Sequence, residues 1–420
     1  MAQLSARGAA FAALTIWRTR QRRADLVISM LLSETKLGPA DRAFALELFY
    51  GVLRNLMLLD FWISCLRPAR VEVELRDILR LGLYQIFLLG TSDHAAVYES
   101  VELAPLKRRG FINGVLRTAV RDRDELRSRA NAQPLSIRKS HPDFLISRWQ
   151  KNFGSGSAAA LCAWNNQPPA VYGRINRLKI DYEQFMHRYS DARPSKHSPA
   201  FVEFFGFPTE ALKRGHCYIQ DPSTTIACRL LGAQPGEKIL DACSAPGGKT
   251  SLLAEQMENR GFIMACDREA NRIQTLKENI TQLGIGIVRE FCHDWTHSRI
   301  PKEIRSLAPF DRILVDAPCT NTGVMRRRID VRWRLQPKDF MRMKKQQLEI
   351  VRAVSCLLKA GGTLVYSTCS IEPEENKQVV QQLLAEFPGM RVIEEESCVP
   401  FRDDLDGAYA AKVVTASPAG

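Results

Sequence analysis

Apolar residues recur at helical spacing through the first third of the chain. The runs that follow this period span residues 9–17, 25–32, 40–57, 75–89, 94–103 and 111–120. Few glycines or prolines interrupt them, and a period near 3.6 residues indicates one buried face on each helix. The pattern therefore predicts an all-α N-terminal domain over residues 1–128.

The pattern changes after this helical region. Residues 127–143 mix Ser, Arg, Asn and Gln with two prolines, a composition typical of a linker. Beyond them, apolar spacing predicts helices over 144–164 and 182–189, and strand-like runs fall at 171–176 and 200–207. Residues 129–232 are therefore expected to form a small α+β module, with Arg174 and Asn176 on the same face of its first strand.

From residue 236 onward, short apolar runs alternate with helical patterns. Strands are expected at 238–242, 261–266, 285–291, 312–317 and 362–367, and helices between them include 271–283 and 340–358. Such alternation predicts a parallel sheet with crossover helices. Residues 233–420 are therefore expected to form an α/β domain of the doubly wound, Rossmann-like class.

The formal net charge of +13 is distributed unevenly. Residues 129–232 carry a net charge of +7, against +5 for residues 1–128 and +1 for residues 233–420. Concentrated positive charge favours a phosphate-bearing partner such as nucleic acid, and solvated surface charge explains it equally well. Charge alone therefore leaves both interpretations open.

Cysteine usage and hydropathy narrow the class of protein. The eleven cysteines are scattered singly, without a C-x-x-C pair, which favours reduced thiols over a disulfide framework or a metal site. No apolar run is long enough to span a bilayer, and the first residues lack the layout of a secretory signal. We expect a cytoplasmic protein with no metal and no membrane partner, and a monomer is favoured.

The stretch L-D-A-C-S-A-P-G-G-K-T at 240–250 lies between an expected strand and an expected helix. A Walker A loop requires G-x-x-x-x-G-K-[ST], and its first glycine falls on Cys243 here. The dinucleotide fingerprint G-x-G-x-x-G is absent. What remains is a glycine turn that lets backbone N–H groups approach a ligand at a helix N-terminus.

Three acids follow three successive strands of this domain. They are Asp241, Asp267 and Asp294. An acid at the end of the second strand is where the ribose diol of a nucleotide is held, and the third is placed to meet an adenine edge. One such acid is weak evidence, but three in succession at the carboxyl ends of a parallel sheet indicate a nucleotide-type ligand.

Two cysteines follow the fourth and fifth strands in the same way. Cys319 lies in D-A-P-C-T-N-T-G at 316–323, and Cys369 in Y-S-T-C-S-I-E-P-E-E-N at 366–376. A single cysteine is most often a small buried hydrophobe. Two at matched positions, each in a polar turn, favour a reactive pair.

These motifs resemble the signature motifs of RNA 5-methylcytosine methyltransferases. The N-terminal stretches D-R-A-F-A-L-E-L-F-Y-G-V-L-R at 41–54 and L-R-L-G-L-Y-Q-I-F-L-L at 79–89 resemble the NusB-like RNA-binding domain. The combination is similar to the bacterial branch of the family that acts on small-subunit ribosomal RNA, and the likeness covers nearly the whole chain. It implies a class I methyltransferase domain and S-adenosylmethionine as the methyl donor.

The resemblance implies roles for individual residues. Cys369 would be the nucleophile, Cys319 would help to remove the carbon-5 proton and expel Cys369, and Asp316 would contact the cytosine. The cofactor would be held by Cys243, Ser244, Ala245, Pro246, Gly247, Gly248, Lys249, Asp267, Asp294 and Asp316. A thiolate that adds to carbon 6 of cytosine makes carbon 5 nucleophilic, which is why this chemistry needs a cysteine.

The RNA partner is assigned to arginine-rich stretches. Arg326, Arg327, Arg328, Arg332 and Trp333 combine phosphate-binding and base-stacking side chains, and Arg174 and Asn176 form a second candidate surface. Solvated surface charge is the alternative for each. Thr320-Asn321 and Arg328-Ile329 depart from the family pattern, which bears on substrate choice more than on the reaction.

Other functions remain open at this point. The RNA substrate is expected to be 16S ribosomal RNA, and transfer RNA or 23S ribosomal RNA are alternatives. An amino-group methyltransferase would need no thiol at Cys369, and a P-loop nucleotidase is disfavoured by Cys243. A non-catalytic RNA-binding assembly factor would need neither cysteine.

Overall fold

The chain folds into two compact units. The computed structural model describes residues 4–20, 22–297 and 299–416. Unit 1 consists of Met1–Gln167 together with Met325–Arg334, and unit 2 consists of Pro168–Val324 together with Leu335–Gly420. The expected middle module is therefore divided, because its residues up to Gln167 belong to unit 1, whereas its strands and the helix expected at 182–189 belong to unit 2.

Unit 1 is helical throughout. Its elements are α1 (Ala6–Arg20), α2 (Ala24–Ser33), α3 (Pro39–Arg54), α4 (Leu56–Leu66), α5 (Val73–Tyr84), η1 (Gln85–Leu89), α6 (Asp93–Glu102), η2 (Leu106–Arg108), α7 (Arg109–Arg121), α8 (Arg123–Asn131), α9 (Leu135–Lys139), α10 (Asp143–Phe153), α11 (Ser155–Asn165) and α18 (Val331–Arg334). The expected all-α N-terminal fold is confirmed. The run expected at 40–57 is two helices, since α3 ends before Asn55 and α4 starts after it.

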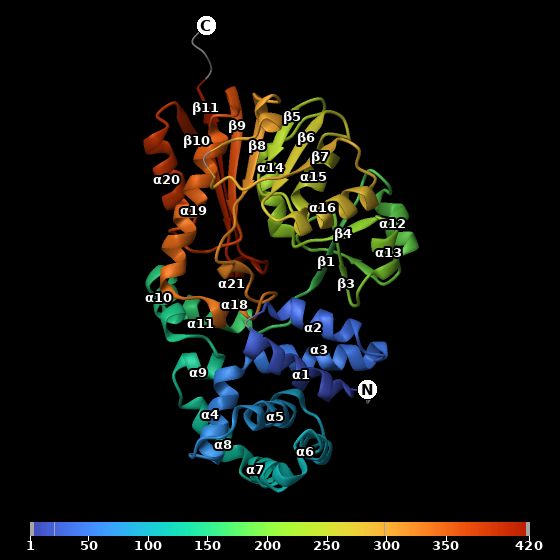
Figure 1. The fold of residues 1–420 in the computed structure, drawn as a ribbon, viewed down its shortest axis with the longest axis vertical. Helices are drawn as coiled ribbons and strands as arrows, with labels where there is room; N and C mark the ends of the chain where they lie inside the picture. The colour runs from blue at the N-terminus through green and yellow to red at the C-terminus, as the bar shows by residue number, and fades with distance from the viewer. Residues whose placement is uncertain (1–3, 21, 298, 417–420) are drawn as a thin grey trace. The chain divides into compact units, whose positions relative to one another are not determined.

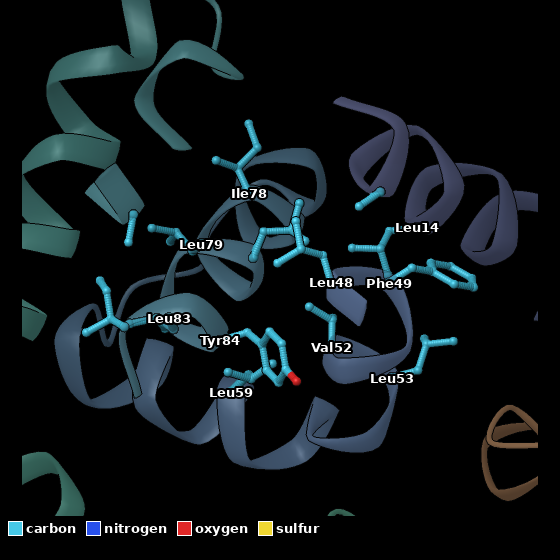
Figure 2. Packing of buried hydrophobic residues seen from close by; sticks show 14 of the residues in the cluster. Leu14, Leu48, Phe49, Val52, Leu53, Leu59, Ile78, Leu79, Leu83 and Tyr84 are labelled. Carbon is cyan, nitrogen blue, oxygen red and sulfur yellow. The ribbon is translucent and has the colours of Figure 1, made fainter. Parts of the chain in front are cut away.

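One apolar core joins the first five helices (Figure 2). Leu14 of α1, Phe49 of α3, Leu59 of α4 and Leu79 of α5 each lose all but 2% or less of their exposed surface. Burial of each such side chain stabilises the fold by about 1.5–3 kcal/mol. These positions are the apolar faces that the helical periodicity predicts.

The expected linker at 127–143 is wrong, because most of this stretch is helical in α8 and α9. Leu126 and Ala130 of α8 are buried in the helical core, and the Trp62 indole donates to the Leu126 carbonyl at 3.0 Å. Ser140 accepts from the Leu58 amide at 3.1 Å. The segment looks like a linker in sequence because only two α8 side chains face the core and the others are polar.

A short segment late in the chain completes unit 1. Within Met325–Arg334, Ile329 is 2% exposed and belongs to the helical core. Asp330 accepts a hydrogen bond from the Ala24 amide at 3.2 Å, near the start of α2. The segment therefore stabilises the helical unit although the sequence places it between strands of the α/β domain.

Unit 2 begins with a small antiparallel sheet. Its elements are β1 (Val171–Ile175), α12 (Tyr182–Arg188), β2 (Ala192–Pro194), β3 (Phe201–Phe204), α13 (Thr209–Lys213), β4 (Cys217–Ile219), η3 (Pro222–Thr224) and α14 (Thr225–Leu231). The strand order is β2-β3-β1-β4. Phe185 of α12 is buried against Val202 and Phe204 of β3 in this module's own core.

The large sheet of unit 2 has seven strands in the order β10-β11-β9-β8-β5-β6-β7 (Figure 1). The strands of this sheet and the helices between them are, in chain order, β5 (Lys238–Asp241), α15 (Gly248–Gln256), β6 (Phe262–Asp267), α16 (Ala270–Leu283), β7 (Val288–Cys292), α17 (Lys302–Arg305), β8 (Phe310–Asp316), η4 (Thr322–Val324), α19 (Pro337–Ser355), β9 (Leu358–Thr368), α20 (Lys377–Glu386), β10 (Met390–Cys398), α21 (Pro400–Asp403) and β11 (Ala408–Thr415). Neighbouring pairs from β7 to β9 are parallel.

Helices cover both faces of this sheet. Alternate residues of β5 point to opposite sides, so Ile239 packs with α14, α15 and α16, and Leu240 packs with α19 and α20. The Rossmann-like fold is thus confirmed. The antiparallel strands β10 and β11 at one edge were not expected, because β10 contains the run Glu394–Glu396, whose charged side chains break the apolar alternation.

The described residues bear on the expectations of no membrane partner and no metal. No single helix there is long and apolar enough to cross a membrane, and the bent pair α3–α4 reaches that length and composition only when its two helices are taken together. Within the same residues, no group of three or more His, Cys, Asp or Glu side chains is arranged to hold a metal ion.

Candidate active site

The carboxyl ends of the parallel strands bring the predicted site residues together. β5 ends at Asp241, β6 at Asp267, β8 at Asp316 and β9 at Thr368, next to Cys369. The strand order reverses direction between β5 and β8, and open α/β sheets bind ligands at this point. The candidate site therefore lies where the fold class places ligands.

The loop at 242–248 is held by backbone and side-chain hydrogen bonds. Ser244 donates to the Cys266 carbonyl through its amide at 2.8 Å and through its hydroxyl at 2.9 Å. The indole of Trp295, which follows β7, donates to the Ala242 carbonyl at 2.8 Å. Neighbouring strands thus fix this loop before any ligand binds.

Gly247 is required by packing. It has a φ of +105°, and a Cβ there would lie 2.7 Å from the Leu276 side chain of α16. A Cβ at Gly248 would lie 2.9 Å from the Tyr218 ring. The absent side chains therefore let the Leu276 side chain and the Tyr218 ring pack against the loop, and backbone access for a ligand at these glycines stays a prediction.

Three carboxylates surround the middle of this loop. Burial, followed by the negative charges of Asp241, Asp267 and Asp316, raises the pKa of the Cys243 thiol well above its ordinary value. Cys243 is therefore a neutral thiol lined by acids from three strand ends. Two of the three predicted acids, Asp241 and Asp267, thus act on one thiol together with Asp316, and a shared ligand stays a prediction.

Asp241 is the most deeply buried of these acids. It is 0% exposed, its Oδ2 accepts from the Thr250 hydroxyl at 2.7 Å, and its Oδ1 has no hydrogen-bond partner among the described residues. Burial raises the pKa of Asp241 to about 7. A buried carboxylate oxygen without a donor is costly unless a ligand supplies one. The sequence placed this acid at the strand end without assigning it a role.

Asp267 and Asp294 occupy the expected strand ends with protein partners of their own. Arg272 of α16 forms an ion pair with Asp267 at 2.9 Å and also donates to the Ala245 carbonyl. Asp294 accepts from the Thr296 amide at 2.9 Å and hydroxyl at 2.7 Å. Burial opposes ionisation of Asp294, but these hydrogen bonds outweigh it and lower its pKa. The roles of both acids toward a cofactor stay predictions.

Lys249 pairs with Asp316. Its Nζ lies 2.7 Å from Asp316 Oδ2, and the Asp316 side chain keeps 31% of its exposure. Burial alone would lower the pKa of Lys249, but the Asp316 charge and hydrogen bond raise it above its ordinary value. The pair therefore presents a fixed negative charge on the accessible side of β8 and a cation next to the loop.

The two predicted cysteines meet. Cys319 Sγ and Cys369 Sγ lie 2.9 Å apart, and both are free thiols. The hydrogen bond to Cys369, burial and the charge of Glu375 raise the pKa of Cys319 well above its ordinary value. Two thiols in contact at adjacent strand ends can act on opposite sides of one bond-making step.

Asn321 fills the space beside the two thiols. Its φ is +62°, a backbone conformation that asparagine tolerates better than most residues other than glycine. Its carboxamide donates to the Cys319 carbonyl at 2.8 Å and accepts from the Cys369 thiol at 3.3 Å. This departure from the family pattern therefore takes part in the site.

Gly323 allows the two cysteine loops to touch. Its amide donates to the Cys369 carbonyl at 3.0 Å, and a Cβ there would lie 2.7 Å from that carbonyl oxygen and from the Gly407 Cα. The Ile371 amide donates to the Thr322 hydroxyl at 3.2 Å. Residues 319–323 and 369–376, named here the cysteine loops, therefore form one hydrogen-bonded unit.

Comparison with known proteins agrees with this geometry. The family described as 16S rRNA methyltransferase RsmB/F matches residues 228–413, the NusB family matches residues 4–121, and a ferredoxin-like domain of RsmF/B-like methyltransferases matches residues 141–202. A probable ribosomal RNA small subunit methyltransferase B from Bacillus subtilis is 32% identical over 92% of this chain and 90% of that protein. The enzyme of that name from Escherichia coli O1:K1 is 33% identical over 91% and 92%.

The chain belongs to the RsmB/F methyltransferase family.

Solved structures agree with this membership. A crystal structure named PH0851 covers 96% of this chain and 97% of its own, with a TM-score of 0.77 and 22% identity, which shows the shared fold. A methyltransferase homologue from Pyrococcus horikoshii, 27% identical, covers 67% of this chain and 97% of its own with a TM-score of 0.59. Membership of the RsmB/F family implies S-adenosylmethionine as the methyl donor.

Two residues predicted to bind RNA are internal in this family member. Arg174 is 2% exposed, and it donates to Gln220 at 2.9 Å, Ser251 at 2.7 Å and Glu255 at 2.6 Å. Asn176 is 3% exposed and donates to the carbonyls of Gly215 and Leu283. The structure contradicts an exposed RNA-binding surface at this strand, because both side chains instead join β1 to the helices beside it.

The arginine-rich segment is also largely internal. Arg332 is 0% exposed and donates to Asn166 Oδ1 at 2.6 Å and to the Asn165 carbonyl at 3.0 Å, and the Arg326 guanidinium stacks 3.9 Å from the Trp164 ring centroid. The Trp333 indole donates to the Leu53 carbonyl at 2.9 Å. These side chains make contacts inside unit 1. The prediction that they form an exposed RNA-binding surface is therefore wrong for these three residues. Arg327 and Arg328 are less buried, and their RNA contact stays a prediction.

Several site residues were missed in the sequence. Asp241 and Glu375 stand inside the quoted motifs without a role, and Trp295 and Gln347 lie outside the motifs. An acid at the first strand end was a usable signal for Asp241. Gln347 and Trp295 carried no local signal, because their partners Pro318 and Ala242 are distant in sequence.

Proposed function

We propose that this protein transfers a methyl group from S-adenosylmethionine to carbon 5 of a cytosine in small-subunit (16S) ribosomal RNA, through a covalent bond between Cys369 and the base. The contact of the Cys319 and Cys369 sulfurs, 2.9 Å apart at the ends of β8 and β9, carries the proposal. An amino-group methyltransferase would need no such pair. The names of the similar proteins supply the ribosomal RNA substrate.

The residues at the loop fit the cofactor. Asp241 Oδ1 is a buried acceptor that lacks a donor, and it suits the ammonium of an amino-acid moiety. Asp267 at the end of β6 suits a ribose diol. When bound, S-adenosylmethionine supplies an electrophilic methyl group.

Each protein group then has one task. The Cys369 thiolate adds to carbon 6 of the cytosine, which breaks the ring aromaticity and makes carbon 5 nucleophilic. Asp316, held by Lys249 and still accessible, hydrogen-bonds the ring nitrogen 3 or the exocyclic amine and favours the addition. Once carbon 5 carries the methyl group, Cys319 removes its proton, and the electrons of that bond expel Cys369 as a thiolate.

Trapping experiments test this function. With 16S ribosomal RNA and S-adenosylmethionine, Cys319→Ala should accumulate a denaturant-stable protein–RNA adduct, because the carbon-5 proton stays in place. Cys369→Ala should form no adduct and transfer no methyl group. Bisulfite sequencing of the RNA should then show one protected cytosine in the wild-type reaction. Methyl transfer by Cys369→Ala would exclude the covalent route, and absence of cofactor binding by calorimetry would favour a non-catalytic assembly factor.

Parallel reactions test the choice of RNA. Methylation of transfer RNA or 23S ribosomal RNA in preference to 16S RNA would redirect the substrate while leaving the reaction in place. Hydrolysis of ATP without methyl transfer would point to a nucleotidase instead.

A further inference from the structure

One buried carboxylate beside the two thiols takes no part in the steps above. Glu375 follows β9 and is 0% exposed. Its Oε1 accepts from the hydroxyls of Thr320 and Ser370, the latter at 2.7 Å, and its Oε2 accepts from the Thr320 amide at 2.8 Å and the Gln347 side-chain amide at 3.0 Å. An ionised carboxylate offers about four acceptor positions. Burial raises the pKa of Glu375, but the hydrogen bonds from Thr320, Ser370 and Gln347 oppose this shift, and the four donors match the charged form.

The origin of these donors is informative. Thr320 directly follows Cys319, and Ser370 directly follows Cys369. Gln347 of α19 also donates to the carbonyl of Pro318, which precedes Cys319, at 2.9 Å. One carboxylate thus holds the residue after each cysteine, and α19 holds the other end of the Cys319 turn.

We propose that Glu375 is the positioning residue for the two cysteines: its carboxylate sets the separation of the cysteine loops, and its charge makes the two thiols unequal, so that Cys319 rests as the proton carrier and Cys369 serves as the nucleophile. The inference rests on the proposed function, because only a reaction with two distinct cysteine roles needs unequal thiols.

The charges around the pair support this asymmetry. The negative charge of Glu375 contributes to the raised pKa of Cys319, and the Lys249 ammonium interacts favourably with an ionised Cys369. The Tyr366 hydroxyl, whose pKa burial raises, stays neutral and donates to the Glu375 carbonyl at 2.5 Å. Asp316 is paired with Lys249. The negatively charged Glu375 therefore acts on Cys319, and the positively charged Lys249 acts on Cys369.

The proton balance of the reaction closes with this arrangement. Before Cys369 attacks, its thiol, which donates to Asn321 in the structure, gives up its proton to solvent, and Cys319 keeps its own. When Cys369 adds to carbon 6, the cytosine ring takes up a proton from solvent at nitrogen 3, beside Asp316, and Cys319 passes its own proton to solvent and becomes the base. The Cys319 thiolate then accepts the carbon-5 proton as the bond from carbon 6 to Cys369 breaks, which restores the pair. Nitrogen 3 releases the one net proton to solvent, and a thiolate with a high pKa is the stronger base for the step.

Thiol reactivity tests the charge part of the proposal without RNA or methyl transfer. Alkylation of the full-length protein by iodoacetamide, followed by peptide mass spectrometry across a pH series, gives a rate for each cysteine. In wild type, Cys319 should react more slowly than Cys369, with a rise only at alkaline pH. Glu375→Gln removes the charge at nearly constant shape and should speed Cys319 alkylation at neutral pH by roughly tenfold or more, since one pKa unit is tenfold.

Matched variants separate charge from general disruption. Glu374→Gln removes a neighbouring carboxylate of the same turn and should keep the wild-type profile. Glu375→Asp keeps the negative charge but shortens the side chain by one methylene group. In this variant Cys319 should still react more slowly than Cys369. An unchanged Cys319 profile in Glu375→Gln would overturn the charge assignment.

Kinetics test the positioning part. Glu375→Gln should lower kcat by roughly 100-fold, as expected when reacting groups shift by about 1 Å, while calorimetry shows the affinity for S-adenosylmethionine within about twofold of wild type. Equal loss of kcat, cofactor affinity and thermal stability would show a merely structural role.

A second variant covers the case in which Glu375→Gln does not fold. Thr320→Val removes one hydroxyl donor and should lower kcat at least about tenfold with cofactor affinity intact, so an unchanged kcat would count against the proposal. Methyl transfer by Cys369→Ala would instead defeat the proposed function, whatever the alkylation profiles show.

Discussion

The residues that follow β8 fall into two groups that look alike in sequence and differ in structure. The cysteine loops combine thiols, hydroxyls and carboxylates, and the segment Met325–Arg334 combines arginines with a tryptophan. In the loops, the Cys319 and Cys369 sulfurs lie in contact, next to the partly exposed Asp316 side chain at the end of β8. In the segment, the polar atoms of Arg332 and Trp333 bind backbone carbonyls and the half-buried side-chain amide of Asn166.

The difference shows which observations separate a polar cluster that stabilises the fold from one that suits a ligand or a reaction. In the segment, the terminal guanidinium nitrogens of Arg332 and the Trp333 indole are matched by protein acceptors, so these contacts contribute to stability, although Arg332 Nε has no such partner among the described residues. In the proposed site, the acceptor without a donor at Asp241 Oδ1 suits a ligand, and the contact of the two thiols suits a reaction. Charge and residue type alone do not distinguish the two.

The largest effect is expected at the nucleophile. Cys369→Ser should lower methyl transfer by roughly 10⁴-fold or more, because a hydroxyl at neutral pH is a far poorer nucleophile than a thiolate. Its free energy of unfolding, from urea denaturation, should stay within about 0.5 kcal/mol of wild type. Substantial activity in the serine variant would mean that the Cys369 thiol, like the side chains of Met325–Arg334, serves the structure and not the reaction.

The opposite result is expected at Arg332. Arg332→Met keeps the length of the side chain but leaves the buried Asn165 carbonyl and Asn166 side chain without their donor. The free energy of unfolding should fall by about 3 kcal/mol, while the folded protein keeps its kcat at low temperature. Weakened RNA binding with unchanged stability would restore the RNA-binding interpretation.

The stability of the protein should depend on pH through Asp241, which belongs neither to the cysteine loops nor to the segment Met325–Arg334. Burial raises the pKa of Asp241 to about 7, so the folded protein retains a proton that the unfolded chain releases near pH 4. This contribution to stability is complete at low pH and is lost as pH rises through about 7. Asp241→Asn, which keeps an acceptor for Thr250, should gain on the order of 1 kcal/mol relative to wild type between pH 5 and pH 8, measured by urea midpoints without cofactor.

The smallest effect on stability is expected at Arg328, an exposed member of the segment. Arg328→Ala should change the free energy of unfolding by no more than about 0.5 kcal/mol. If the predicted RNA contact exists, the slope of log affinity for 16S RNA against log salt should fall by about 1. An unchanged slope would assign Arg328 to solvated surface charge.

The fold was largely predictable from local patterns, and so was the pair of cysteines that the structure brings into contact. Helical periodicity identified the unit 1 helices, strand alternation identified β5 to β9, and the motifs carried Cys319 and Cys369. Each of these signals lies within a few neighbouring residues, where spacing reports the buried face directly.

The features that escaped prediction depend on contacts between distant residues. The Trp333 indole meets Leu53, and Arg174 meets Glu255, so neither sequence neighbourhood reveals that the side chain is internal. Strand β10, at the edge of the sheet, contains several exposed charged residues. Its sequence therefore lacks the alternation of apolar and polar residues that predicts a strand. Glu375 was visible as a motif residue, but its four donors come from three separate parts of the chain.

The late segment of unit 1 also has a consequence for biosynthesis. A nascent chain emerges from the ribosome in order, and domains generally fold as units once their residues are available. Ile329 and Arg332 complete the helical unit, yet they are made only after β5 to β8. The N-terminal unit therefore reaches its final packing only when translation has passed residue 334, and a chain that stops at residue 167 would lack part of its own core.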